Sequence, residues 1–178
     1  MLIVNVHIAL SMASKTGPIG LVDWKQGKEN YDAVMVDGQR IPVSPDAFFT
    51  LQDNRRSPES NLAHFFLEAD LSSENHRYFK NKIIGAAHYY QQARQVEKFQ
   101  IRGFRVLTVA LNEARARNLC LLAQSLLPEG ALRKLFLFTS VQSFSLDRPE
   151  TIFEPICFSP RDTDLGTRRL IMPAPVSF

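Results

Sequence analysis

Residues 64–71 read HFFLEADL, an apolar run interrupted by two acids. Because the side chains of a strand alternate between its two faces, Phe66, Glu68 and Asp70 share one face and Phe65 points to the other. Two carboxylates roughly 7 Å apart along a strand repel each other and lose hydration when they are buried. The stretch therefore predicts a largely buried strand whose acids need compensation at that end of the sheet.

Strands and helices are predicted on both sides of this stretch. Residues 46–52 (DAFFTLQ) pair with it as a hairpin across the polar loop 53–61. Residues 104–111 (FRVLTVAL) form a nearly continuous apolar run, which is typical of a strand covered on both faces. The remaining predicted strands are residues 19–25, 31–37 and 134–144, and the predicted helices are residues 1–14, 73–98 and 111–126.

The long predicted helix, residues 73–98, carries apolar residues three and four positions apart and therefore one buried stripe. Ser72 and Ser73 stand at its start as candidate caps. Gly85 lies in its middle, where glycine costs about 1 kcal/mol relative to alanine. This glycine indicates close packing of the helix against another element.

The predicted order is one helix, a meander of antiparallel strands, the long helix, a strand, a second helix and a last strand. A strand–helix–strand crossover after such a meander gives an α/β (α+β) fold, a mixed β-sheet flanked by helices on both sides. A chain of 178 residues suits one domain. We place this domain at residues 1–160 and expect residues 161–178 to form a loosely packed C-terminal tail.

The composition is that of a soluble globular protein, with 45% hydrophobic and 22% charged residues. A net charge of +3 permits a polyanionic partner without requiring one. Cys120 and Cys157 lack the close spacing of a zinc knuckle, so a reduced, cytoplasmic protein is the simplest interpretation. The start lacks the basic leader of a signal peptide, and no stretch is long and apolar enough to cross a membrane, so we expect no membrane partner.

Three acids are expected to meet at one end of the sheet. Asp46 begins the first strand of the hairpin, and Glu68 and Asp70 end the second. Divalent cations such as Mg²⁺ or Mn²⁺ bind carboxylate oxygens together with waters and a substrate phosphate, and a cation would remove the repulsion between the two neighbouring acids. The alternative from the residues alone is a solvated strand end that binds nothing.

Lys82 lies on the helix that follows the acidic strand, roughly 60° from Phe79 on a helical wheel and at the border of the buried stripe. From this position its side chain can lean over the strand end and meet a phosphate or an activated water. The alternative is a lysine that extends past an apolar face into solvent and has no chemical role.

An ordered set of segments resembles a known family: PDAFFTL (45–51), FFLEADLSSE (65–74), FKNK (79–82) and FRVLTVAL (104–111). Over about residues 1–140 the chain resembles the replication-relaxation family of plasmid proteins and the related relaxases of the MOB-C type. The resemblance implies a restriction-endonuclease-like fold of the PD-(D/E)XK superfamily. In the usual form of that site a lysine follows the carboxylate by two positions on one strand. Asp70 stands at that lysine position here, so Lys82 would supply the charge from the helix.

The resemblance implies metal-dependent cleavage of DNA in plasmid replication, mobilisation or relaxation. Carried over by position, Asp46, Glu68 and Asp70 would hold Mg²⁺ or Mn²⁺, and Lys82 would stabilise charge near the scissile phosphate. A metal-activated water is the expected nucleophile. Attack by a tyrosine of the same helix is an alternative, with the candidates Tyr78, Tyr89 and Tyr90.

DNA is the implied partner. Family members often carry an N-terminal winged-helix region, for which this chain has no room. A partner protein, or a winged-helix domain outside this sequence, would then supply DNA specificity. A catalytically inactive DNA-binding or replication-accessory module with the same fold is the alternative function, and a plain protein-interaction domain is a third.

Two groups of basic residues are candidates for contact with the DNA backbone. The first lies in the loop between the two acidic strands, and the second at and after the end of the long helix: Arg55 and Arg56, then Arg94, Lys98, Arg102 and Arg105. Phosphate contacts of this kind weaken as salt is added. The alternative for both groups is a solvated surface. His64 is expected to be structural, although it shares a face with Glu68.

Overall fold

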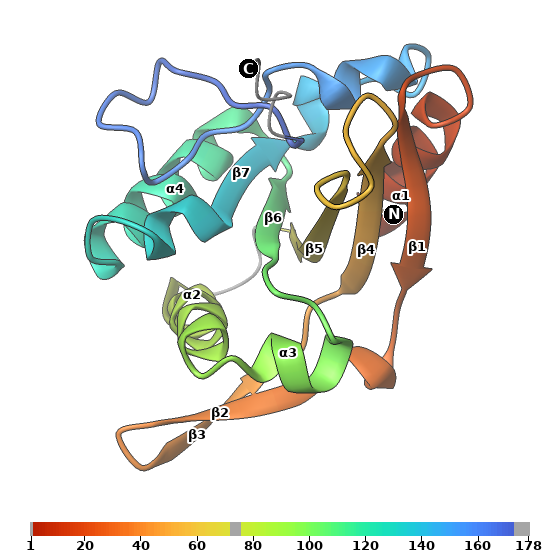
Figure 1. Cartoon of the computed structure of the whole chain (residues 1–178). Coiled ribbons are helices and arrows are strands. Elements are labelled where there is room, and N and C mark those ends of the chain that lie inside the picture. The colour runs from red at the N-terminus through yellow and green to blue at the C-terminus, as the bar shows by residue number, and fades with distance from the viewer. Residues whose placement is uncertain (1, 72–75, 173–178) are drawn as a thin grey trace.

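The fold is that of a computed structural model, which describes residues 2–71 and 76–172. The helices are α1 (Leu2–Ala13), α2 (His76–Gln91), α3 (Arg94–Phe99) and α4 (Glu113–Leu126). The strands are β1 (Ile19–Lys25), β2 (Asp32–Val36), β3 (Gln39–Val43), β4 (Ala47–Asp53), β5 (Leu62–Asp70), β6 (Arg105–Ala110) and β7 (Phe136–Ser140). Figure 1 shows the sheet between α1 on one side and α2 and α4 on the other.

The central sheet is mixed and has the strand order β1-β4-β5-β6-β7. Strands β1, β4 and β5 form an antiparallel meander, whereas β5, β6 and β7 run parallel to one another. The parallel pairs are joined through α2 and α3 and then through α4, as parallel strands require a crossover connection. The predicted fold class, a mixed sheet flanked by helices, is therefore confirmed.

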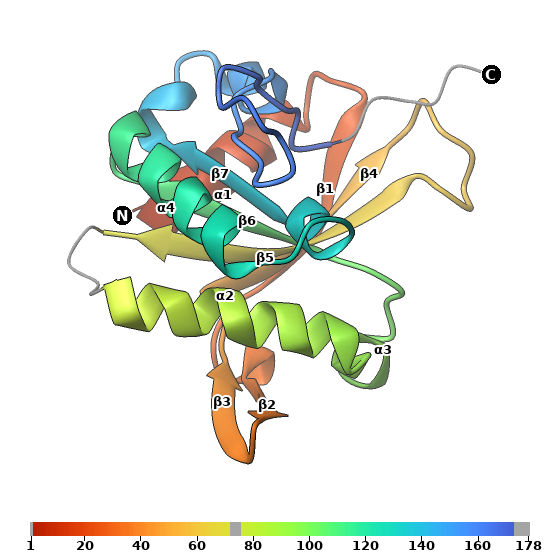
Figure 2. The same cartoon turned by 90° about the vertical axis from the view of Figure 1, so that its left-hand side faces the viewer.

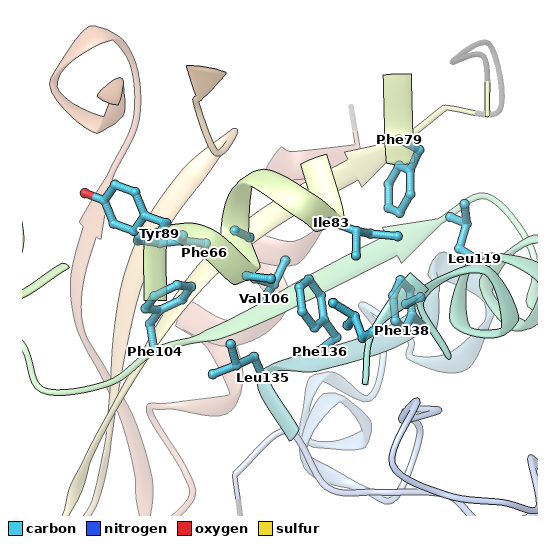
Figure 3. Close-up of a cluster of buried hydrophobic side chains, with 14 of the residues drawn as sticks. Phe66, Phe79, Ile83, Tyr89, Phe104, Val106, Leu119, Leu135, Phe136 and Phe138 are labelled. Carbon is cyan, nitrogen blue, oxygen red and sulfur yellow. The ribbon is translucent and has the colours of Figure 1, made fainter. Parts of the chain in front are cut away.

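Each face of the sheet has its own hydrophobic core, and β5 contributes to both. Phe65 and Leu67 are fully buried in the cluster under α1, which also contains the buried residues of that helix. Phe66 belongs to the opposite cluster, where Figure 3 shows Phe79 and Ile83 of α2 facing side chains of β6 and β7. Glu68 and Asp70, two and four residues further on, continue the face of Phe66. The predicted alternation in HFFLEADL is confirmed.

The expected long helix is two helices. Ala93 between α2 and α3 has a left-handed backbone with φ 55°, and its N–H donates to the carbonyl of Tyr90. The bend lets Phe99 pack against Phe48 and Phe66, with ring centroids 4.8 and 5.4 Å apart. Tertiary contacts thus override a helical pattern that continues through the bend. The candidate caps Ser72 and Ser73 lie outside the described residues.

Strands β2 and β3 form a separate hairpin that projects beyond the main sheet, as Figure 2 shows below α2. Its turn, Asp37-Gly38, has positive φ at both residues, which is the backbone of the tight hairpin turn that this dipeptide favours. Helix α2 lies against the hairpin. A Cβ atom on Gly85 would stand 3.2 Å from Cγ2 of Ile41 and 3.5 Å from the carbonyl of Pro42. The close packing predicted at Gly85 is confirmed.

Substituting Gly85 with leucine is expected to lower the free energy of unfolding by about 1–3 kcal/mol, because the added side chain would push α2 away from the hairpin. Urea denaturation checks this value. Gly103→Leu is the control, since nothing lies within 4 Å of a Cβ atom at Gly103. Equal losses in the two variants would contradict the close packing as the cause.

The C-terminal segment differs from expectation in its described part. Residues 161–172 do not form a loose tail, because Ile171 and Met172 are buried in the core under α1. Cys157 and Arg169 exchange two backbone hydrogen bonds of 3.0 and 2.7 Å. This bridge holds the segment against the preceding chain, so the packed domain extends beyond residue 160.

None of the helices among the described residues combines the length and apolar character needed to cross a bilayer. Cys120 and Cys157 are free and buried. Burial raises the pKa of each thiol to about 12, so both remain protonated and unreactive near neutral pH.

Candidate functional site

Asp46 and Glu68 lie opposite each other where β4 begins and β5 nears its end. The antiparallel register pairs Ala47 with Leu67, and its continuation places Asp46 beside Glu68. The N–H of Asp46 donates to the carbonyl of Leu67 at 2.9 Å, and Oδ2 of Asp46 accepts from the N–H of Ala69 at 2.8 Å. These two bonds fix the Asp46 carboxylate at the edge of the acidic strand.

Lys82 of α2 reaches Glu68 across the sheet–helix interface. Nζ of Lys82 lies 2.9 Å from Oε2 of Glu68, and both side chains are largely buried. The lysine also lies over the ring of Tyr78, 5.0 Å from its centroid. A small cavity of about 10 Å³, near the size that admits one water, is lined by Glu68, Lys82 and Thr108 together with apolar side chains. The helix lysine thus lies over the acidic strand, as its wheel position predicts.

Asp70 has a different partner, which the sequence did not reveal. Arg115 donates to both carboxylate oxygens of Asp70, through Nε at 2.7 Å and Nη2 at 3.1 Å. Asp70 is fully buried, and only 15% of the Arg115 side chain is exposed. Such a two-point ion pair compensates the aspartate charge without any added cation.

The position of Arg115 follows from the end of β6. Asp70 pairs in register with Ala110, the last residue of β6, and α4 starts three residues later. Asn112 caps that helix by accepting from the N–H of Arg115 at 2.8 Å. The first turn of α4 therefore lies beside Asp70. The usable signal in the sequence was the Asn-Glu-Ala-Arg start of a helix directly after a buried parallel strand.

The three predicted acids do not form a metal-binding group. Within residues 2–71 and 76–172, no three His, Cys, Asp or Glu side chains are placed so as to hold a metal ion. Asp70 forms an ion pair with Arg115, whereas Asp46 and Glu68 lie opposite each other at the strand ends. Mg²⁺ is held in many sites by one or two carboxylates with waters and phosphate oxygens, so the donor chemistry of this pair fits such an ion.

A pocket of about 470 Å³ opens beside Asp46. Its lining comes from the segment after β1 and the segment before β4, and includes Lys28, Tyr31 and Ser44. Lys98 of α3 donates to the carbonyl of Tyr31 at its rim. The Asp46 side of the candidate site is therefore open to a ligand of substantial size, with cations nearby.

The predicted basic residues are divided between two places. Arg55 and Arg56 both contact the buried Asp53, and the hydrogen bonds from Arg55 lower the pKa of that aspartate. Arg94 pairs with Asp32 and Glu97 near the projecting hairpin. Arg102 is exposed. Figure 1 shows the β4–β5 loop, which carries Arg55 and Arg56, and α3, which carries Arg94 and Lys98, at opposite ends of the molecule. Arg105 of the second group lies close enough to Arg56 for the charge of Arg56 to lower its pKa, in addition to the larger effect of burial.

The three candidate tyrosines have different environments. Tyr89 is fully buried and donates to Oδ2 of Asp32 at 3.1 Å, and burial raises its pKa strongly. Tyr90 is partly buried against Phe104. Tyr78 is 54% exposed and lies beside Lys82. Among these three, Tyr78 is the residue that lies at the candidate site.

His64 forms a hydrogen bond of 2.9 Å with the hydroxyl of Thr50 on the neighbouring strand. Its ring stacks on Phe48, and burial lowers its pKa despite the opposing charge of Asp23. These contacts favour the structural interpretation of His64.

The lowered pKa of His64 predicts a loss of stability in acid. The unfolded histidine takes up its proton near pH 6.5, whereas the folded one does so only at lower pH. Protons therefore favour the unfolded chain, and the free energy of unfolding should fall as pH decreases below about 6.5. Urea denaturation between pH 8 and 5 checks this, with a shallower slope expected for His64→Gln. Identical slopes would contradict the prediction.

Comparison of the chain with protein-family models, with curated proteins and with solved structures finds no match in any of the three.

Proposed function

We propose that this protein is a metal-dependent domain that cleaves phosphodiester bonds of DNA, with an active site formed by Asp46, Glu68 and Lys82. The observation that carries the proposal is the placement of Asp46 beside Glu68 at the ends of two paired strands, with Nζ of Lys82 2.9 Å from Glu68. Asp46 directly precedes β4, Glu68 lies in β5 and Lys82 lies in α2. The register therefore puts two acids opposite each other on neighbouring segments, and the ion pair adds a cation from the helix.

Each residue has a distinct role in this proposal. Asp46 and Glu68 would hold a Mg²⁺ or Mn²⁺ ion, which when bound polarises the phosphate and lowers the pKa of a coordinated water. Lys82 offsets negative charge that develops on the phosphate, and its buried surroundings strengthen that interaction. Asp70 acts through Arg115 by fixing the end of β5, rather than by contacting the metal.

The wider setting follows from the resemblance to replication-relaxation proteins and MOB-C relaxases. It suggests plasmid DNA as the substrate, the cytoplasm as the place of action and a partner or winged-helix domain as the source of sequence specificity. Two buried, free cysteines are compatible with a reducing compartment. The element order, an antiparallel meander followed by two parallel crossovers, supports a restriction-endonuclease-like arrangement.

A second function, a catalytically inactive DNA-binding or replication-accessory module, is favoured by one specific observation. Asp70 occupies the usual lysine position and is neutralised by Arg115, and the described residues contain no group of three metal ligands. A module of this kind would bind DNA in a salt-sensitive manner but would neither bind Mg²⁺ nor cleave.

Incubation of the protein with supercoiled plasmid and Mg²⁺ or Mn²⁺ tests the proposal. We expect nicked product that disappears with a chelator, and a loss of about 100-fold or more for Glu68→Gln, because that change removes a negative metal ligand. Glu129→Gln is the matched control, since Glu129 is exposed and lies outside the site. Gel quantification of the nicked form gives the rates.

Two results would overturn cleavage as the function. One is the absence of nicking by the wild-type protein with either metal. The other is equal nicking by wild type and Glu68→Gln. If calorimetry then shows no Mn²⁺ binding while DNA binding persists at low salt, the inactive module is the correct interpretation.

A further inference from the structure

A second pocket, of about 340 Å³, lies at the start of β6 and β7, under the C-terminal segment. Basic side chains from four parts of the chain line it: Arg105, Lys134, Arg161, Arg168 and Arg169. Apolar residues such as Leu137 and Leu170 form the rest of the wall together with Ser159. The fold therefore gathers in one cavity five cations that are scattered along the sequence.

Neighbouring acids neutralise only part of this charge. Arg169 donates through Nε to Oδ2 of Asp162 at 3.0 Å, and Arg161 lies 3.9 Å from the same carboxylate. Arg168 stacks on Phe158 and pairs with Glu113 at 2.6 Å. Among the described residues, the ion pairs of these five cations involve two carboxylates, those of Asp162 and Glu113, which leaves an excess of positive charge in the pocket.

The environment of Arg105 differs from that of the other three arginines, which form ion pairs with carboxylates. Nη1 of Arg105 donates to the carbonyl of Ile171 at 3.1 Å, and among the described residues no carboxylate forms an ion pair with Arg105 or with Lys134. Burial lowers the pKa of Arg105, and the positive charges of Arg161 and Arg56 add to that effect. A partly buried guanidinium surrounded by other cations is stabilised by an anion at this position.

We propose that this pocket binds a phosphate group. Arginine forks match the oxygens of phosphate in geometry as well as charge, and a volume of about 340 Å³ lies in the range of small-molecule sites. The apolar wall offers surface to a group attached to the phosphate. The phosphate can belong to a nucleotide or be free inorganic phosphate, and the experiment separates these sources.

This inference goes beyond the proposed cleavage function, because the basic pocket shares no lining residue with the pockets at Asp46, Glu68 and Lys82. Arg105 pairs with Phe65, whose side chain lies in the core under α1, and Leu137 belongs to the same core. Glu68 and Lys82 lie on the other face of the sheet, beside Phe79 and Ile83 of α2. Binding to the basic pocket can therefore be measured without a divalent metal and without cleavage.

Isothermal titration calorimetry in low salt, with a chelator present, tests the inference. The probes are adenosine 5′-monophosphate, inorganic phosphate and adenosine. We expect the monophosphate to bind, adenosine not to bind, and the affinity for the monophosphate to fall about 10-fold or more in a Lys134→Met/Arg161→Gln variant. Both residues are exposed enough for the variant to fold, and Lys15→Met, an exposed lysine outside the pocket lining, is the control.

Each outcome decides the inference. Tighter binding of the monophosphate than of inorganic phosphate assigns the site to nucleotides, and equal binding assigns it to free phosphate. The inference is overturned if neither phosphate binds, if adenosine binds as well as its monophosphate, or if the double variant keeps the wild-type affinity. Because no metal is present, these results do not depend on whether the protein cleaves DNA.

Discussion

Replacing Asp70 with alanine is expected to lower the free energy of unfolding by about 3–5 kcal/mol, the largest effect of any single substitution proposed for this chain. Asp70 is fully buried, and Arg115 donates to both of its oxygens. Removing the carboxylate leaves a largely buried guanidinium without its anion, which costs far more than the net value of the pair. Urea or guanidinium denaturation measures the change.

The control for Asp70→Ala is Glu97→Ala, which breaks the exposed ion pair with Arg94. An exposed pair contributes only about 0.2–1 kcal/mol, so this variant should remain close to wild type in stability. A loss below 1 kcal/mol for Asp70→Ala would contradict the structural role assigned to the buried pair.

A double variant, Asp70→Leu with Arg115→Met, separates structure from chemistry. Replacing both members of a buried ion pair with apolar residues of similar volume is often neutral for stability. If Asp70 only fixes the strand, this folded variant retains cleavage. If it retains stability but loses all cleavage, Asp70 belongs to the metal set after all, and the role assigned to it under the proposed function is wrong.

Lys82→Met is expected to slow plasmid nicking by about 10²–10³-fold, the loss typical of removing one positioned charge-stabilising group from an active site. Nζ of Lys82 lies 2.9 Å from Glu68, and its largely buried position limits the access of water that would weaken its charge. Single-turnover nicking rates at saturating Mg²⁺ measure the effect of this variant.

Lys80→Met on the same helix is the matched control, because Lys80 is exposed and two residues away. Denaturation of both variants establishes that each is folded at the temperature of the assay. A rate for Lys82→Met within threefold of the Lys80→Met rate would exclude Lys82 from the chemistry. Tyr78→Phe, measured in the same series, tests the tyrosine nucleophile, and full activity in that variant favours water.

Local patterns were sufficient to predict most of the sheet. The alternation in HFFLEADL placed Glu68 and Asp70 on one face, and the continuous apolar run of β6 indicated a strand covered on both sides. Both patterns arise from the spacing of apolar and polar residues within one short segment. They can therefore be recognised without knowing which distant segments pack against it. Gly85 likewise indicated a close approach of α2 to another element, because glycine is unfavourable in the middle of a helix.

The interruption between α2 and α3 was not predictable in this way. The apolar spacing of a helix continues through Ala93, and no proline interrupts it. The bend is stabilised by Phe99 packing on Phe48 and Phe66, which are more than thirty residues away in sequence. The packing of Ile171 and Met172 under α1 likewise depends on a surface that exists only once the sheet has formed.

The chain by itself determined the faces of its strands, the acids at the end of the sheet and the helix position of Lys82. The tertiary structure alone decided which charge compensates which acid. Lys82 and Arg115 both come from helices that follow parallel strands. The register of β5 with β6 places Arg115 beside Asp70, and Lys82 forms its ion pair with Glu68. Ion pairs form between groups that the fold brings close together. The separation of these groups along the sequence therefore does not indicate which cation pairs with which acid.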